Sequence, residues 1–190
     1  MAYTALFAFG DSLSDAGNDW IVDGHTDPVP PYYQGHFSNG LTWVEDLSNM
    51  LGLGTLTPSL AGGHDFAFGG AETGPTLIEG ANPGDLLGQI SQYGLFHREP
   101  EPGALYTLDI GGNDIDKAID LLRAGKITTS GVGTVVARAE TNTVHAVQTL
   151  FGLGARNLLF YEVPDLGLTP QPPRRRTGLA KSRQRPCGVV

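Results

Sequence analysis

The sequence predicts a one-domain parallel α/β fold in which helices cover both faces of the sheet. Short apolar runs alternate along the chain with segments of helical period. The runs are continuously apolar, as expected for strands that are buried on both faces. A length of 190 residues, 40% of them hydrophobic, suits one domain with a sizeable core. We find no internal repeat and no internal domain boundary.

The first half of the chain supplies two expected strands and two expected helices. Residues 6–9 form an apolar run that ends at Gly10, and residues 66–68 form a second run that ends at a glycine pair. Residues 42–51 and 85–96 each place apolar side chains at helical intervals. We therefore expect the order strand, helix, strand, helix up to residue 96.

The second half repeats this alternation. Residues 104–110 read as a strand that ends at a second glycine pair, and residues 114–124 follow with helical period. A long helix is expected over residues 132–151. The last expected strand, residues 157–163, stops at Pro164, because proline cannot donate to a sheet ladder.

Charge is divided unevenly along the chain. Residues 1–170 hold six basic residues and all 20 acidic ones, a formal charge of −14, whereas residues 171–190 hold six basic residues and no acidic one. The acidic body argues against binding to nucleic acid. Residues 171–190 are rich in Pro, Arg, Ser and Gly and show no helical or strand period. We expect a folded domain over residues 1–170 and a disordered basic tail over residues 171–190.

Composition also limits the kinds of site. A single cysteine, Cys187, excludes a disulfide framework and a thiolate metal cluster. The histidines are scattered without an H-x-x-x-H pair, so we expect no metal. No apolar run approaches the roughly 18 residues of a membrane span. No secretory signal is visible, so we expect an intracellular protein as the chain stands, or a secreted one whose signal was removed.

Three loops carry residues that could take part in catalysis, and each loop follows an expected strand. Ligands bind at the carboxyl ends of strands in parallel sheets, which is where these loops lie. Taken singly, Ser12 reads as a helix cap, the Gly69–Gly70 pair as a tight turn, and Asn113 or Asp114 as another cap. Taken together, they supply a hydroxyl nucleophile, a backbone donor and a side-chain donor, which are the parts of an acyl-transfer site. The G-x-S-x-G motif of α/β-hydrolases is absent.

At these residues the sequence resembles the GDSL, or SGNH, family of ester hydrolases and lipases, in its bacterial lipase/phospholipase-like branch. The resemblance covers about residues 5–170 and implies a three-layer α/β/α sandwich with a parallel, flavodoxin-like sheet, the SGNH hydrolase fold. The stretches that carry it are Phe9–Asn18, Phe66–Ala71 and Asp109–Asp114, and more weakly Phe37–Val44 and Val163–Pro170.

The resemblance also implies roles for individual residues. Ser12 would be the nucleophile, and its own N–H, the N–H of Gly69 and the side chain of Asn113 would form the oxyanion hole. Gly70 is the alternative to Gly69. Asp11, Gly70 and Asp114 would support the site.

The chain departs from the family at the general base. The family places its base in a late Asp-x-x-His block, and no Asp or Glu of this chain has a His three residues later. None of the five histidines follows His145; His25 and His36, which follow Ser12 in a loop-rich segment, are the best candidates. We expect the fold to lack its last helix, with or without an edge strand. The strand over residues 157–163 would then be uncovered and would pair with a second copy, giving a homo-oligomer.

These observations lead to one functional prediction with two alternatives. We expect a carboxylic ester hydrolase that acts on a small-molecule ester without a cofactor. A site without its base retains about 10³–10⁴-fold acceleration over water in serine hydrolases, so a weak esterase is physically reasonable. In the first alternative a partner chain supplies the base. In the second the chain is a catalytically silent remnant that binds ligands on the same fold.

Overall fold

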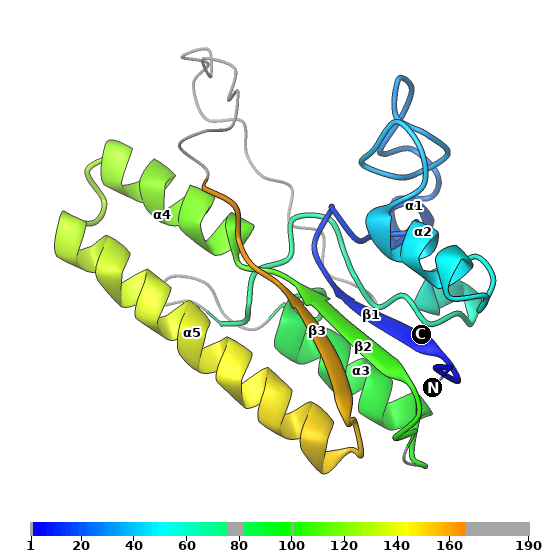
Figure 1. Cartoon of the computed structure of the whole chain (residues 1–190). Helices are drawn as coiled ribbons and strands as arrows, with labels where there is room; N and C mark the ends of the chain where they lie inside the picture. The colour runs from blue at the N-terminus through cyan, green and yellow to red at the C-terminus, as the bar shows by residue number, and fades with distance from the viewer. Residues whose placement is uncertain (1, 76–81, 100, 166–190) are drawn as a thin grey trace.

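The computed structural model describes residues 2–75, 82–99 and 101–165. Its sheet has three parallel strands in the order β1 (Leu6–Gly10), β2 (Leu105–Asp109) and β3 (Asn157–Tyr161). The connection from β1 to β2 contains the first three helices and a 3-10 turn, and the connection from β2 to β3 contains the last two (Figure 1). The helices are α1 (Asn18–Val22), α2 (Trp43–Met50), α3 (Leu86–Phe96), α4 (Gly112–Arg123) and α5 (Thr129–Gly152), and the 3-10 turn η1 is Ser59–Ala61.

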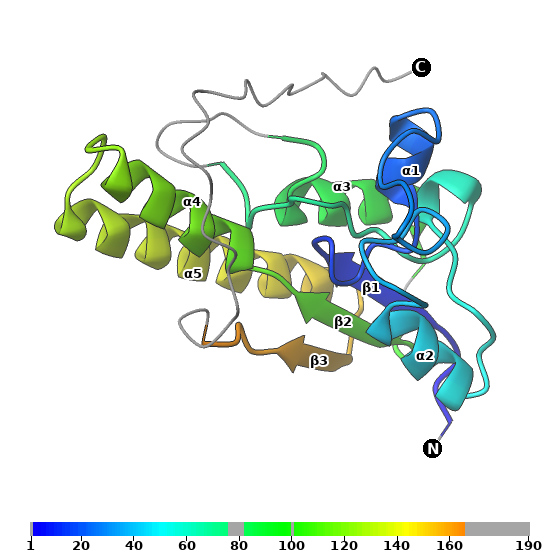
Figure 2. The ribbon, with the colours of Figure 1, turned by 90° about the horizontal axis from the view of Figure 1, so that it is seen from above.

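Helices lie on both faces of the sheet, which confirms the predicted α/β/α layering (Figure 2). Phe7 and Phe9 of β1 and Tyr106 of β2 point to one face, where α3 and α5 cover them. Leu6 of β1 points to the opposite face, where it packs with Val44 of α2. Every residue of β1 and β2 is buried, as expected for continuously apolar strands in the middle of three layers.

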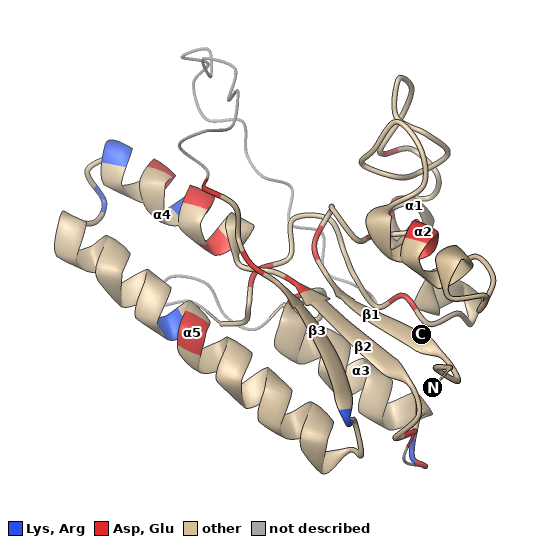
Figure 3. Cartoon of the chain, in the orientation of Figure 1, with Lys and Arg blue, Asp and Glu red and all other residues tan. Residues whose placement is uncertain are grey.

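Strand register brings the loops that follow β1 and β2 to the same edge of the sheet. Gly10 at the end of β1 lies opposite Asp109 of β2, and Asp109 lies opposite Tyr161 of β3. The segments that follow Gly10 and Asp109 therefore leave the sheet side by side. Acidic residues gather at these strand ends (Figure 3).

The predicted strand over residues 66–68 is wrong in detail. This segment runs parallel to β1, with Phe66 N–H donating to Ala8 and Phe68 N–H donating to Gly10. Only isolated bridges form, in which Asp65 pairs with Ala8 and with Pro58. The side-chain amide of Asn18 donates to the outward carbonyls of Asp65 and Ala67, at 2.8 and 2.9 Å. These carbonyls are therefore taken by a side chain rather than by a neighbouring strand.

Element boundaries differ from the prediction by a few residues. α4 begins at Gly112 rather than 114, α5 at Thr129 rather than 132, and β3 ends at Tyr161 rather than 163. α1 and η1 are short and escape prediction from the sequence, because neither has a full amphipathic period. The expected tail, residues 171–190, and most of the Val163–Pro170 stretch lie outside the described residues.

Candidate active site

Ser12 lies two residues beyond β1, in a tight turn at the carboxyl edge of the sheet. The Asp11 carbonyl accepts hydrogen bonds from the N–H groups of Ser14 and Asp15, both at 3.0 Å. This single turn does not continue as a helix, so Ser12 is not the helix cap that its local pattern suggested, and α1 begins only at Asn18. Ser12 is half-buried, and no described residue accepts from its N–H or hydrogen-bonds its hydroxyl. Both groups are therefore available to a ligand.

The carboxylate of Asp11 joins this turn to α4. One oxygen accepts from the N–H of Leu13 at 3.0 Å, and the other lies 3.4 Å from the side-chain amide of Asn113. Asp11 is buried, and burial, reinforced by the nearby Asp109 and Asp114, raises its pKa to about 6, while the Leu13 N–H opposes the rise. The structure thus brings the predicted nucleophile loop and the predicted amide donor together through Asp11.

Asn113 sits in the first turn of α4, directly after β2. Its amide donates to the carbonyl of Ala71 at 2.8 Å, which fixes the side chain at this edge. Its contact with Asp11 is 3.4 Å long, at the weak end of the hydrogen-bond range. One amide hydrogen is therefore firmly held, and the other is only loosely engaged.

The glycine pair after residue 68 does not present the N–H that the resemblance assigns to an oxyanion. Gly69 N–H donates to the carboxylate of Asp15 at 3.1 Å, so it is already bonded. A side chain at position 69 would collide with Asp19 and with the ring of Phe37, which explains the glycine there. Gly70 is exposed with φ +72°, a conformation that favours glycine, and no described residue accepts from its N–H. In this structure the free N–H of the pair belongs to Gly70.

Asp114 positions the loop that holds Asn113. Its two oxygens accept from the hydroxyl and the N–H of Thr73, at 2.8 and 3.0 Å. Asp114 is buried, and this burial raises its pKa, while the bonds to Thr73 lower it. Because Thr73 lies two residues after Ala71, the pair fixes the carbonyl to which Asn113 donates.

Two positioning residues are not among the predicted site residues. Gln89 of α3 is fully buried and holds the end of β1, accepting from Gly10 N–H at 2.9 Å and donating to Gly10 O at 2.7 Å. Trp43 of α2 donates to Ser14 at 3.1 Å and to Asp109 at 3.0 Å. Gln89 could have been found from sequence, because a polar residue at that position interrupts the apolar face of the predicted helix over residues 85–96.

Buried carboxylates surround the loop after Ser12. Asp65 is fully buried, accepts from the N–H groups of Ala16 and Ala67, and has a pKa well above its ordinary value because of desolvation. Burial also raises the pKa of Asp19 to about 7, with a further rise from Asp15. Asp15, whose pKa burial raises as well, accepts N–H bonds from both its own turn and Gly69. Burial therefore raises the pKa of each of the three carboxyl groups around this loop.

Stability is expected to fall as the pH rises from 5 to 8. A carboxyl with a raised folded-state pKa stays protonated in the folded chain after the unfolded chain has lost its proton, so each such group destabilises the fold above about pH 4. His36 acts in the same direction, because its contact with Glu45 raises its pKa and that stabilisation disappears as the pH rises. Urea unfolding at several pH values measures this slope. Asp19→Asn should flatten it between pH 5 and 8, and stability that increases over that range contradicts the prediction.

The described histidines are engaged elsewhere or exposed. Buried His36 contacts Glu45 at 2.9 Å and the carbonyl of Tyr33 at 2.9 Å, so both ring nitrogens have partners. His25 and His145 are exposed. His64 and His97 pack around Phe7, with ring centroids 4.4 and 4.7 Å from it. Within the described ranges, no hydrogen bond or ion pair connects any of the five with Ser12.

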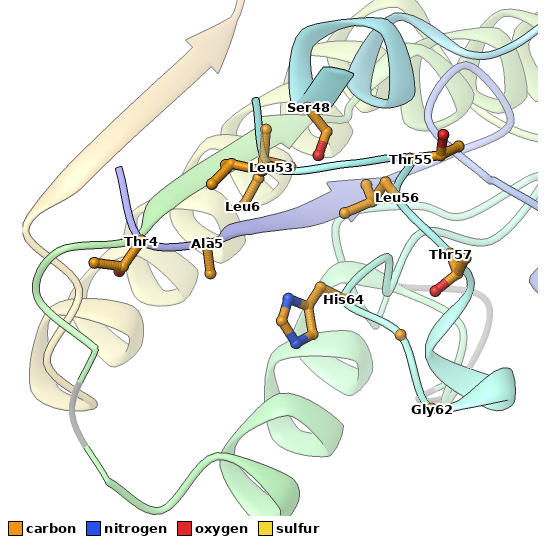
Figure 4. A pocket seen from close by; sticks show the side chains of 11 residues that line it. Thr4, Ala5, Leu6, Ser48, Leu53, Thr55, Leu56, Thr57, Gly62 and His64 are labelled. Atoms are coloured by element: carbon orange, nitrogen blue, oxygen red, sulfur yellow. The ribbon is translucent and has the colours of Figure 1, made fainter. Parts of the chain in front are cut away.

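A separate pocket of about 270 Å³ lies at the other end of β1 (Figure 4). Leu6 at the start of β1 lines it, with Thr4 and Ala5 just before the strand and His64. Because Ser12 follows the carboxyl end of the same strand, this pocket is not part of the candidate site. In the part of the chain that the structure describes, no group of three or more His, Cys, Asp or Glu residues could hold a metal ion. No described helix is long and apolar enough to cross a membrane.

Comparison with known proteins settles the family. The model of the GDSL-like lipase/acylhydrolase family matches residues 6–187. The chain belongs to this family of ester hydrolases. The match spans all three loops of the candidate site, so the GDSL resemblance of the motifs around Ser12, Gly69 and Asn113 is confirmed at the level of the family.

Curated GDSL relatives are similar over most of this chain. Lipase 1 of Photorhabdus luminescens is 32% identical over 174 residues, covering 90% of this chain and 24% of that protein. A phosphatidylcholine-sterol acyltransferase of Aeromonas hydrophila is 29% identical, covering 89% of this chain and 47% of that protein. A thermolabile hemolysin of Vibrio parahaemolyticus is 26% identical, covering 87% of this chain and 35% of that protein. The chain thus spans less than half the length of these three relatives.

Proposed function

We propose that this chain hydrolyses carboxylic esters with Ser12 as the nucleophile. The observation that carries the proposal is the place of the Ser12 hydroxyl, which no described residue hydrogen-bonds. It lies at the carboxyl edge of the sheet, in a turn that the Asp11 carboxylate links to the Asn113 amide. Membership of the GDSL-like lipase/acylhydrolase family supports ester hydrolysis as the reaction class. The proposed substrate is a small-molecule ester with a short to medium acyl chain.

In the proposed reaction, Ser12 Oγ attacks the ester carbonyl carbon and its proton passes to solvent or to a base. The carbonyl oxygen takes the negative charge and would be bound by the N–H of Ser12 and the loosely engaged amide hydrogen of Asn113. Collapse of this intermediate breaks the ester C–O bond, the alcohol leaves with a proton, and water then hydrolyses the acyl-serine.

A third oxyanion donor would come from the glycine pair. Gly70 N–H has no described partner, which favours it in this conformation. Gly69 N–H would first have to leave Asp15, whose two oxygens also accept from Gly17, Asn18 and Asp19. We therefore propose that Gly69 or Gly70 supplies the third N–H to the oxyanion. Gly70 supplies it unless the loop rearranges and frees the N–H of Gly69.

Turnover is proposed to be slow in the isolated chain. All five histidines are exposed or contact groups other than Ser12, so deprotonation of the serine has no evident side-chain base among the described residues. Binding and an oxyanion hole alone give about 10³–10⁴-fold acceleration in serine hydrolases. A base supplied by a partner chain would raise the rate further, whereas a ligand-binding module without turnover is the alternative that the same observation favours.

Hydrolysis of p-nitrophenyl acetate and butyrate by the purified chain tests the proposal. Wild type should hydrolyse both esters faster than Ser12→Ala, because the variant cannot form an acyl-serine and keeps only the acceleration that binding and the remaining oxyanion donors supply. Ser91→Ala is the matched control: Ser91 is an exposed serine of α3 that donates to Leu87, and its loss should leave the rate unchanged. A folded wild-type protein that is as inert as Ser12→Ala on both esters contradicts the proposal and supports the binding module.

A further inference from the structure

The two edges of the sheet differ in whether another strand could pair with them. Beside β1, the outward carbonyls of Asp65 and Ala67 are bonded by the Asn18 side chain, and the N–H of Ser59 donates to Asp65 as well. That side is closed to another strand. On the other side, β3 is the outermost strand of the described sheet (Figure 2). One row of its backbone N–H and C=O groups therefore faces away from β2 with no described strand beside it.

β3 also lacks the features that usually protect an edge strand. Its five residues, Asn157 to Tyr161, include no charge, proline or glycine. Leu159, Phe160 and Tyr161 are 40%, 47% and 49% exposed. Tyr161 lies on the α2 side, with its ring centroid 5.8 Å from that of Trp43, whereas Leu158 packs on the opposite side with α3 and α5. Both faces of the strand thus carry apolar groups, and the face on the α2 side is only partly covered.

The charges that flank β3 are self-complementary. Arg156 precedes the strand and Glu162 follows it, both exposed, and the strand between them is uncharged (Figure 3). One guanidinium nitrogen of Arg156, Nη1, donates to the carbonyls of Phe151 and Ala155. In an antiparallel pair of identical strands centred on Leu159, Arg156 of each copy lies opposite Glu162 of the other. The same register sets Leu158 opposite Phe160 and Asn157 opposite Tyr161. A single two-fold axis therefore produces two opposite-charge pairs around an apolar centre.

We propose that β3 is a dimerisation edge whose occupant is a second copy of this chain. Two β3 strands pair antiparallel about a two-fold axis at Leu159, which joins the two sheets into one of six strands. A parallel pairing of two copies would instead set Arg156 near Arg156 and Glu162 near Glu162, which like-charge repulsion disfavours. The pairing satisfies the outward backbone groups of β3 and buries Leu159 and Tyr161, and it is independent of the proposed ester hydrolysis.

Sedimentation velocity tests the charge register. Wild type at 50 µM should be a dimer. Glu162→Arg places a like charge opposite Arg156 of the other copy, so two attractive cross-strand pairs become repulsive. The dissociation constant of the dimer should rise about ten-fold or more. The double variant Arg156→Glu with Glu162→Arg restores opposite charges and should recover the dimer. A monomeric wild type, as when the chain's own residues 166–190 cover β3, overturns the proposal, and so does a dimer that Glu162→Arg leaves unchanged.

Disulfide formation tests the two-fold axis itself. In a Cys187→Ser background, Leu159→Cys should form an intermolecular disulfide on mild oxidation, because residues directly opposite in antiparallel strands have Cα atoms about 4.5–5.5 Å apart, within disulfide range. Met50→Cys, at an 84% exposed position of α2, is the matched control and should remain reduced under the same conditions. Equal cross-linking of both variants, or cross-linking of Met50→Cys alone, overturns the proposed axis.

Discussion

Replacement of Asn113 by alanine is expected to lower kcat for ester hydrolysis by about 10²–10³-fold with little change in KM. The amide would bind the oxygen only as it gains negative charge, so its loss raises the barrier of the chemical step rather than weakening substrate binding. The Asn113 amide is already oriented by the Ala71 carbonyl at 2.8 Å, so it needs no rearrangement to donate its second hydrogen. Steady-state kinetics on p-nitrophenyl butyrate measure both constants.

The control for Asn113 is an asparagine outside the site. Asn49 is an exposed residue near the end of α2 whose side chain accepts from Thr55, and Asn49→Ala should retain wild-type kcat. Thermal unfolding of Asn113→Ala separates a catalytic effect from loss of fold, because the bond to Ala71 is also removed. A folded Asn113→Ala with wild-type kcat would remove Asn113 from the proposed oxyanion hole.

The largest effect on stability is expected at Gln89. Gln89→Leu removes three bonds to buried backbone, to Gly10 N–H, Gly10 O and Gly84 O. Gly10 O keeps the N–H of Phe68, so the groups left without a partner are Gly10 N–H and Gly84 O. Each such buried group costs about 1–3 kcal/mol, so we expect the free energy of unfolding to fall by about 2 kcal/mol or more. Urea unfolding followed by circular dichroism measures the loss.

This variant should also lower ester turnover in the protein that remains folded, because Gly10 lies two residues before Ser12 and its hydrogen bonds fix the start of the turn. Gln148→Leu, at an exposed position of α5, makes the same chemical change without a buried partner and should change stability by no more than about 0.5 kcal/mol. Equal free energies of unfolding for Gln89→Leu and Gln148→Leu would show that the Gln89 hydrogen bonds make no net contribution to stability.

The amino-acid sequence is sufficient to predict the layers of the fold and the meeting of its loops. Apolar runs locate all three strands, and parallel strands must end at one edge, so the strand pattern alone places Ser12 and Asn113 near each other. The segment over residues 66–68 is harder to predict, because its apolar pattern is that of a strand. Only the contacts of the distant Asn18 side chain show that its outer carbonyls already accept hydrogen bonds.

Individual donors within the site could not be predicted from local pattern. The Gly69 N–H is bonded to Asp15, a contact between residues far apart in sequence that depends on how the first turn folds back on the glycine pair. Nothing at Gly69 itself signals this partner. The burial of Asp65 is similar, since a lone Asp before an apolar run resembles an exposed turn residue until its bonds to Ala16 and Ala67 are seen.

Covalent labelling with a fluorophosphonate tests most directly whether Ser12 is the nucleophile, because the reagent reports on the serine without requiring the right ester. Intact-mass analysis and peptide mapping should find one adduct per chain, on Ser12, and none on Ser12→Ala. An adduct on another residue, or equal labelling of wild type and Ser12→Ala, would contradict the proposed role of Ser12.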